Sequence, residues 1–321
     1  MAPPVMVHPA RPRVLLVCLG VILTLAGLLT LPATPALARG KVHCQSPTHP
    51  VALFAQIDPV TAPGVAPSAH EHEFAGNRHL LDLGERQDAV YGDLVGAATT
   101  CSLAGDTAGY WWPSVSSATG RLTAIRVLPY YYSGSARRPT IKRPTEPFPP
   151  DLRMVAGNAT ATASQNTDWI GWSCGANSTK PLAKYTSPAA ADCATAGSGA
   201  ELTFHANFPD CWTGQLNSHT GPANTAEFSG QPGAVTDQMA YSDPLTALCP
   251  AGFPHKLPTL RITVHFPYKG DGTDIRLSSG SQYSMHTDFW NTWVQDVLVK
   301  FNLDCVSNLG GGTAGPSSLC G

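Results

Sequence analysis

Two segments in the second half of the chain alternate strictly between apolar and polar residues. In "AELTFHANF", residues 200–208, every second residue from Leu202 to Phe208 is apolar, and "LRITVHF", residues 260–266, repeats the pattern. Successive side chains of a strand point to opposite faces of the sheet, so this period predicts antiparallel strands with one buried face. We expect His205 and His265, which alternate with the apolar residues, on the exposed faces.

A helical period marks one segment near the C-terminus. Between Asp288 and Phe301 the apolar residues, among them Trp290 and Trp293, recur at every third or fourth position. This stripe predicts one amphipathic helix. Thr287 or Asp288 would cap its start by accepting a bond from a free backbone N–H.

Long loops connect these elements. The stretches 58–68, 133–151 and 213–236 are rich in Pro, Gly, Ser and Thr. They read as loops rather than domain linkers, because cysteines and strand patterns resume directly after them. The predicted fold is mostly β, an antiparallel and sandwich-like sheet with one C-terminal helix and long loops, stabilised by disulfides.

The N-terminus has the order of charged, apolar and small residues that is typical of a secretory signal peptide. Arg11 and Arg13 precede an apolar run of 18 residues, 14–31, and prolines break this run before "ALA" at 36–38. A retained membrane anchor is the alternative, since a run of this length marginally spans a bilayer. We predict a signal peptide over residues 1–38 and one secreted, extracellular domain over 39–321, without stable membrane insertion after cleavage.

Eight of the nine cysteines remain in the predicted mature chain. An even count in an exported chain indicates disulfides, and there is no C-x-x-C that would indicate zinc bound by thiolates. Pairing the cysteines in sequence order gives two long and two short spans, and Cys320 ends a glycine-rich tail. We therefore predict pairing in sequence order: Cys44–Cys101, Cys174–Cys193, Cys211–Cys249 and Cys305–Cys320.

Charge argues against a nucleic-acid partner. Only 13% of residues are charged, and removal of two signal-peptide arginines from the 20 basic residues leaves 18 against 22 acidic ones. Nucleic-acid binding ordinarily shows a basic excess. The loop "SARRPTIKRP" is a local exception, either a clamp for anionic sugars or cell-wall phosphates or, more simply, a solvated loop with Arg137, Arg138, Lys142 and Arg143.

The stretch "PSAHEHEFAGN", residues 67–77, carries the first candidate chemistry. If 69–75 is a strand, His70 and His72 share one face while Glu71 and Glu73 share the other. Two imidazoles on one face can bind one metal ion or divide acid and base roles on a substrate. The alternative is a pair of histidines that hydrogen-bond to loop backbone and hold the following turn.

Two further stretches carry candidate residues. In "SMHTDFWN", residues 284–291, His286 would lie just before the predicted helix, where free N–H groups favour an anionic ligand, and Asp288 could be a catalytic carboxylate, a metal ligand or a cap. In "GDTAGYWWP", residues 105–113, Asp106 lies close to three aromatic residues that could form a platform for a sugar ring. Core packing is the simpler use for the aromatic residues. The candidate ligand contacts in these stretches are Tyr110, Trp111, Trp112, Asn77 and Asn291.

Several familiar signatures are missing from the sequence. It contains no G-x-S-x-G elbow, no phosphate-binding glycine loop and no H-E-x-x-H helix. The predicted first mature residue is Arg39 rather than His, which sets aside the copper oxygenases that use an N-terminal histidine as ligand. Any activity must come from a less familiar arrangement.

The motifs in combination resemble a family of secreted fungal and actinobacterial proteins, the domain of unknown function nineteen-ninety-six. The resemblance spans nearly the whole predicted mature chain and includes "HEHEFAGN" (70–77), "DTAGYWWP" (106–113), "FPDCWTG" (208–214), "CPAGFPHKLPTL" (249–260) and "MHTDFWNTW" (285–293). It implies an extracellular, disulfide-bearing domain, sometimes found with carbohydrate-binding modules, without an assigned reaction. It also implies that a polar site is shared by His70, His72, Asp106, His286 and Asp288.

One position departs from the family pattern. Where the family typically has Ser-His-Met, this sequence has "DQM", with Gln238 at the histidine position. If that histidine is a ligand or a proton shuttle, this member would be weakened, unless His219 in the loop upstream replaces it.

Three functions remain open from the sequence. The first is a polysaccharide-active enzyme, a hydrolase or lyase, in which a histidine moves a proton and a carboxylate orients it. The second is a non-catalytic protein that binds a glycan or cell-wall polymer. The third is a protein that binds a divalent metal at His70, His72 and His286.

Overall fold

The computed structural model describes residues 39–45, 53–82, 86, 89–177, 179, 184–216, 238–307 and 319–320, besides Met1 and Pro4. Almost all of the predicted signal peptide and His219 lie outside the described residues. By their contacts, residues Ala36–Gly321 form one compact unit and Met1–Pro35 another. The description below concerns the first of these.

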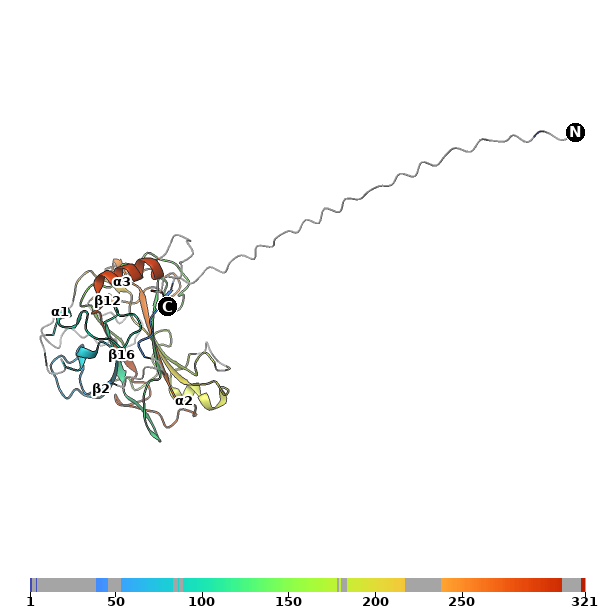
Figure 1. Ribbon diagram of the computed structural model, residues 1–321. Helices are drawn as coiled ribbons and strands as arrows, with labels where there is room; N and C mark the ends of the chain where they lie inside the picture. Colours follow the sequence, from blue (N-terminus) through green and yellow to red (C-terminus); the bar gives the residue numbers. More distant parts are fainter. Residues whose placement is uncertain are drawn as a thin grey trace. The chain divides into compact units, whose positions relative to one another are not determined.

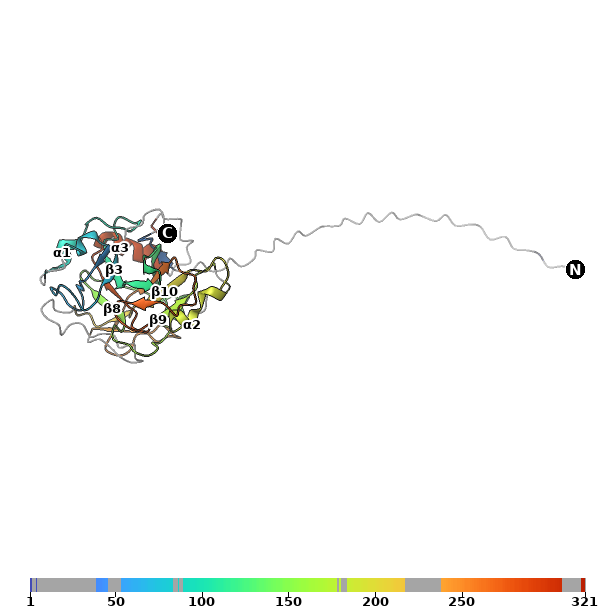
Figure 2. The same ribbon diagram turned by 90° about the horizontal axis from the view of Figure 1, so that it is seen from below.

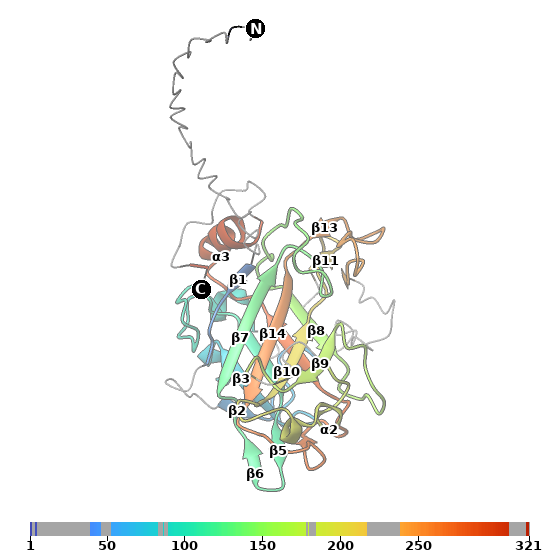
Figure 3. The ribbon, with the colours of Figure 1, turned by 90° about the vertical axis from the view of Figure 1, so that its right-hand side faces the viewer.

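Two five-stranded antiparallel sheets form the frame of this unit (Figure 3). The first sheet has the order β1 (Arg39–Lys41), β7 (Arg126–Tyr132), β14 (Thr259–Phe266), β10 (Leu202–Asn207) and β9 (Ile170–Ser173). The second sheet has the order β2 (Leu53–Ala55), β3 (His72–Gly76), β4 (Gly109–Pro113), β16 (His286–Trp290) and β8 (Arg153–Gly157).

The main hydrophobic core lies between the two sheets. The apolar residues of β10 and β14 predicted to be buried are buried, and β10 pairs with β14 from Leu202 opposite Phe266 to Asn207 opposite Arg261. They share one cluster with Tyr110, Trp112 and Phe289 of the second sheet. The predicted strands and the sandwich-like class are confirmed.

The C-terminal helix is shorter than predicted. Helix α3 covers Gln295–Phe301 and continues as a π-helix, Asn302–Val306, whereas residues 286–290 form strand β16. The N-cap is Val294, without a side-chain bond, so the predicted capping by Thr287 or Asp288 is wrong. Tertiary pairing decides the outcome, because β16 gains backbone partners on both sides, from β4 and from β8.

Small elements surround the two sheets. Two three-stranded sheets are formed by β11 (Cys211–Trp212), β12 (Met239–Ala240) and β13 (His255–Lys256), and by β5 (Val115–Ser117), β6 (Gly120–Leu122) and β15 (Arg276–Leu277). The short helices α1 (Tyr91–Leu94) and α2 (Pro188–Ala191) lie on opposite sides of the strands in two views (Figure 1, Figure 2).

Four disulfides stabilise the fold, and the predicted pairing is confirmed. They join Cys44 to Cys101, Cys174 to Cys193, Cys211 to Cys249, and Cys305 to Cys320. Such a number of bridges fits an oxidising compartment. Among the described residues, no helix has the length and apolar character that crossing a membrane requires.

Candidate functional site

The candidate site lies on the face of the second sheet that points away from the main core. Phe74, Trp111 and Trp290 on this face form a second, smaller core with Ile57 and Val60, which belong to the loop after β2. The loop therefore covers the outer face of the sheet. At the edge of this small core, the apolar residues give way to histidines.

Strands β3 and β16 bring His72 and His286 to this edge. His72 pairs with Pro113 at the last position of β4, and His286 pairs with Gly157 at the last position of β8. His70 lies two residues before His72, and its ring centroid is 4.3 Å from that of His72. Residues more than 200 positions apart in the sequence thus meet, as predicted.

The three rings converge through their Nε2 atoms. His286 Nε2 lies 3.2 Å from His70 Nε2 and 3.5 Å from His72 Nε2. The plane of the His286 ring is nearly perpendicular to both others, at 88° to His70 and 89° to His72. One nitrogen from each ring lies within 4.8 Å of the other two, so all three face a common point.

Backbone carbonyls fix the protonation of two of the rings. His72 Nδ1 is 2.9 Å from Ile57 O, and His286 Nδ1 is 2.9 Å from Ser284 O. A carbonyl oxygen only accepts, so each Nδ1 carries the hydrogen and each Nε2 of the neutral ring is a free lone pair. This outer hydrogen bond is the one that metal-binding histidines ordinarily make.

Burial keeps the rings neutral. His72 and His286 are at most 1% exposed, whereas His70 is half-buried and opens the cluster to solvent. Burial, assisted by the nearby His72, lowers the pKa of His286 to about 3 and that of His70 to about 4. Burial also lowers the pKa of His72, against the attraction of Asp58. Neutral imidazole is the form that binds metals.

Two buried carboxylates accompany the histidines. Asp288 lies on the same strand face as His286, with its Oδ2 3.9 Å from His286 Nε2. Asp58 is 4% exposed and accepts bonds from the N–H groups of Val60 and Thr61. Burial alone would raise the pKa of Asp58, but the adjacent His72 and the Thr61 bonds lower it overall.

The sequence analysis missed Asp58. It lies in a stretch interpreted as a loop, and only the fold shows that this loop returns over His72. The one local signal is the spacing of Asp58 and Thr61, which suits an Asx-type turn. That signal predicts a turn and says nothing about what the turn covers.

The spacing of the nitrogens fits one divalent transition-metal ion. A tetrahedral ion with nitrogen ligands at about 2.0–2.1 Å separates any two of them by about 3.3 Å. The observed separations of 3.2 and 3.5 Å bracket this value. The three histidines could hold such an ion, and the partly exposed His70 marks the side of the cluster nearest to solvent.

Asp106 is not part of this cluster, contrary to the prediction. It precedes the first residue of β4, whereas His72 pairs with the last residue of that strand. Its carboxylate lies in the main core, where it accepts a bond from Tyr110 Oη at 3.0 Å, and Tyr110 Oη is 2.7 Å from Tyr131 Oη. Burial raises the pKa of Asp106 to about 8.

The predicted ligand contacts are core residues. Trp111 and Trp112 point to opposite faces of the sheet, as expected, but both are fully buried, so neither offers a platform for a sugar. Tyr110 is buried as well. The amides of Asn77 and Asn291 are committed to backbone carbonyls, those of Leu94 and Thr107 for Asn77 and those of Phe148 and Pro149 for Asn291.

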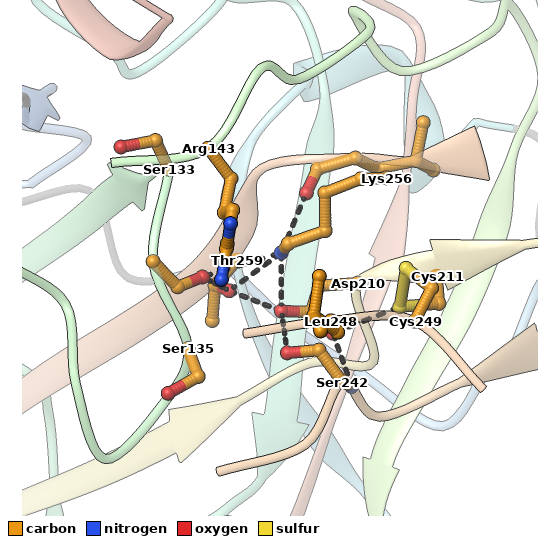
Figure 4. Close-up of polar contacts among 12 residues, drawn as sticks. Ser133, Ser135, Arg143, Asp210, Cys211, Ser242, Leu248, Cys249, Lys256 and Thr259 are labelled. Atoms are coloured by element: carbon orange, nitrogen blue, oxygen red, sulfur yellow. Dashed lines mark hydrogen bonds and ion pairs between the residues drawn. A yellow bond between two sulfur atoms is a disulfide. The ribbon is translucent and has the colours of Figure 1, made fainter. Parts of the chain in front are cut away.

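A second polar cluster surrounds Asp210 (Figure 4). Its carboxylate accepts bonds from Lys256 Nζ at 2.6 Å, from the backbone N–H and hydroxyl of Ser242 at 2.7 and 2.8 Å, and from Thr259 Oγ1. Asp210 is 1% exposed and its two oxygens are satisfied by these donors. The cluster therefore joins β13 and β14 to the chain beside β11 and β12, which is a structural role.

Comparison with known protein families shows which family the chain belongs to. Residues 58–293 match the family described as "Domain of unknown function (DUF1996)", which is more than half of the 321 residues. The chain belongs to this family. No curated protein and no solved structure matches the chain. The matched range of DUF1996 includes all three histidines together with Asp58 and Asp288.

The departure at Gln238 does not fall in the histidine cluster. Gln238 directly precedes β12 in the small sheet of β11, β12 and β13, and its side-chain oxygen accepts a bond from the Thr213 hydroxyl. The three histidines are supplied by other segments of the DUF1996 domain. His70, His72 and His286 converge without a contribution from position 238.

Proposed function

We propose that this chain is a secreted metalloenzyme in which His70, His72 and His286 bind one divalent transition-metal ion. The observation that carries the proposal is the convergence of three Nε2 atoms, two of them unprotonated because their Nδ1 atoms donate to carbonyls. Three histidines and an open position are the ligand set of many catalytic zinc sites.

The proposed chemistry acts on an extracellular polysaccharide. His70, His72 and His286 would hold the ion, which would supply Lewis-acid chemistry to a water or to a substrate oxygen. Asp288, 3.9 Å from the His286 nitrogen, would accept a proton or orient the fourth ligand. The four disulfides and the resemblance to secreted proteins support an extracellular substrate.

Metal stoichiometry tests the first part of the proposal. Protein purified without an affinity tag and dialysed against zinc, copper, nickel or manganese should retain one equivalent of one of these metals. His286→Ala should retain none, whereas His255→Ala should retain the full equivalent. His255 is the matched control because it lies outside the cluster, paired with Glu146. A wild-type protein without stoichiometric metal overturns the proposal.

A polysaccharide screen tests the second part. Metal-loaded protein should release reducing ends or unsaturated products from one of a panel of plant, fungal and bacterial polysaccharides, and His72→Ala should abolish the release. Retention on an insoluble glycan without any product would show instead a binding protein. Unchanged product formation by His72→Ala would show that the activity belongs to another site.

A further inference from the structure

The outer face of the first sheet, which points away from the main core, is polar. The cluster of His70, His72 and His286 belongs to the second sheet. Because one face of β10 and β14 packs into the core, the alternate residues point outward, and Figure 3 looks onto this face. The hydrogen-bonding residues here include His205, whose Nε2 is 2.7 Å from Ser173 Oγ. Thr263 lies opposite His205 on β14.

A cluster of three cations occupies one side of this face. The stem of Lys184 lies over Gly171 of β9, since a Cβ added at Gly171 would be 3.3 Å from Lys184 Cβ. Arg261 and Arg137 are near enough to repel the Lys184 ammonium electrostatically. Among the described carboxylates, Asp168 attracts the Lys184 ammonium, and Asp168 also forms an ion pair with Arg137 at 3.3 Å.

Among the described residues, the Lys184 ammonium has no anion at ion-pair distance. Lys184 is only partly exposed, and its ammonium makes no hydrogen bond or ion pair with any described residue. Within the described part of the chain, Arg261 hydrogen-bonds to Asn207 Oδ1 and Ala136 O, which are neutral acceptors, and to no acid. Positive charge therefore exceeds negative charge in a partly desolvated region, where an anion is favoured.

A cavity with an aromatic pair adjoins the cations. It has a volume of about 60 Å³, and Ala136, Asp168, Trp169 and Tyr241 are among the residues that line it. The rings of Trp169 and Tyr241 are stacked, with centroids 4.4 Å apart and an angle of 10°. The volume holds several waters or one substituent of a sugar ring, and aromatic rings in such sites pack against the apolar faces of ligands.

We propose that this face binds an anionic saccharide, with its oxyanion beside Lys184 and Arg261 and its ring beside the cavity of Trp169. The chain as a whole has a formal charge of −2, so the attraction is local and does not suit an extended nucleic acid. The site uses neither the cluster of His70, His72 and His286 nor a metal. This proposal is therefore independent of the proposed metalloenzyme.

Only one basic residue of the loop "SARRPTIKRP" belongs to this cluster of cations. Arg137 does, through its ion pair with Asp168, whereas Arg143 donates to Thr246 O at 2.8 and 3.0 Å, and neither Arg138 nor Lys142 is among the charges that act electrostatically on Lys184. Lys142 is therefore a matched control, a neighbouring lysine of equal charge outside the proposed site. Lys184→Met removes the ammonium and keeps the stem over Gly171, so the sheet should fold unchanged.

Affinity electrophoresis and calorimetry at low ionic strength test the proposal. The probes are polygalacturonate, dextran sulfate and a teichoic acid, which distinguish carboxylate, sulfate and phosphate, with neutral dextran and xylan as references. Wild-type protein should bind at least one anionic polymer and neither neutral one. Lys184→Met should weaken binding about tenfold, the loss of one charge-assisted bond. Lys142→Met should bind like wild type, and Lys184→Arg should retain binding.

Three results would overturn the proposal. The first is that no anionic polysaccharide binds. The second is equal weakening by Lys142→Met and Lys184→Met, which would show a diffuse effect of charge. The third is equally tight binding of poly-glutamate, which would show that a saccharide ring contributes nothing and that any polyanion, including an acidic protein, is accepted.

Discussion

The Nε2 atoms of His72 and His286 lie 3.5 Å apart although each ring donates its Nδ1 hydrogen to a backbone carbonyl. Two lone pairs therefore face each other in a buried site. A hydrogen bond cannot form between two acceptors, and a proton or a metal ion is needed to make the contact favourable. Because burial lowers the pKa of both rings, a metal ion is the better candidate.

Metal should therefore stabilise the fold. A ligand that binds only the native state at 100 times its dissociation constant adds about 2.7 kcal/mol to the free energy of unfolding. We expect an increase of this order on addition of the preferred metal and its loss on chelation, measured by denaturant unfolding. His286→Ala should show no increase, and His255→Ala should show all of it. An equal increase in His286→Ala would place the metal elsewhere.

Gly157 should be required for the position of His286. Its φ is +92°, and an added Cβ would lie 2.7 Å from Met285 O and 3.0 Å from His286 Cα. Gly157→Ala should displace β16 at the histidine, lower metal affinity at least about tenfold and destabilise the protein by about 1–3 kcal/mol. Calorimetric titration with metal measures the first effect.

Gly120 provides the control for backbone strain. Its φ is +118°, but an added Cβ would meet nothing within 4 Å. Gly120→Ala should therefore carry a cost of strain without a change in metal affinity. Equal loss of affinity in both variants would mean that the histidines respond to general destabilisation and not to the contact at His286.

Sequence patterns predicted the parts of the fold that depend on local periodicity and covalent chemistry. The alternation from Leu202 to Phe208 suffices for β10, since half-burial is its cause. The order of the cysteines sufficed for the disulfides. Residues 288–294 were wrongly assigned to the helix, because Trp290 and Trp293 fit the helical stripe that runs to Phe301, and pairing with β4 and β8 makes residues 286–290 a strand.

The candidate site was predicted in its histidines and in Asp288, but not in its second carboxylate, Asp58. His70, His72 and His286 belong to distinctive motifs, so the sequence alone was enough to predict that they take part in a site. Asp106 belongs to an equally distinctive motif, yet it lies in the main core. Asp58 belongs to no distinctive motif, yet it lies beside His72. Which loop covers a sheet face depends on packing over long sequence distances, which periodicity does not report.

Asp106 should affect stability and not metal binding. Burial raises its pKa to about 8, from an ordinary value of 3.8. Between these pH values the native state holds a proton that the unfolded chain releases, so the free energy of unfolding falls as pH rises, by at most about 1.4 kcal/mol per pH unit. Asp106→Asn should remove this component. Denaturant unfolding at pH 5 and pH 8 should then show a smaller decrease for the variant, and metal titration should show no change.

The anionic-saccharide face should respond to pH through Lys184. Burial, with Arg261 and Arg137 nearby, lowers the pKa of Lys184 to about 8 against the attraction of Asp168. The ammonium is therefore lost as pH rises through about 8, and binding of the anionic polymer should weaken in that range. Burial holds the pKa of the adjacent His205 well below its usual value, so His205 stays neutral throughout. Lys184→Arg, which remains charged, should bind equally at pH 7 and pH 9 when measured at constant ionic strength. If wild type and Lys184→Arg weaken in parallel, the titrating group is not Lys184, and the oxyanion does not lie where the proposed site puts it.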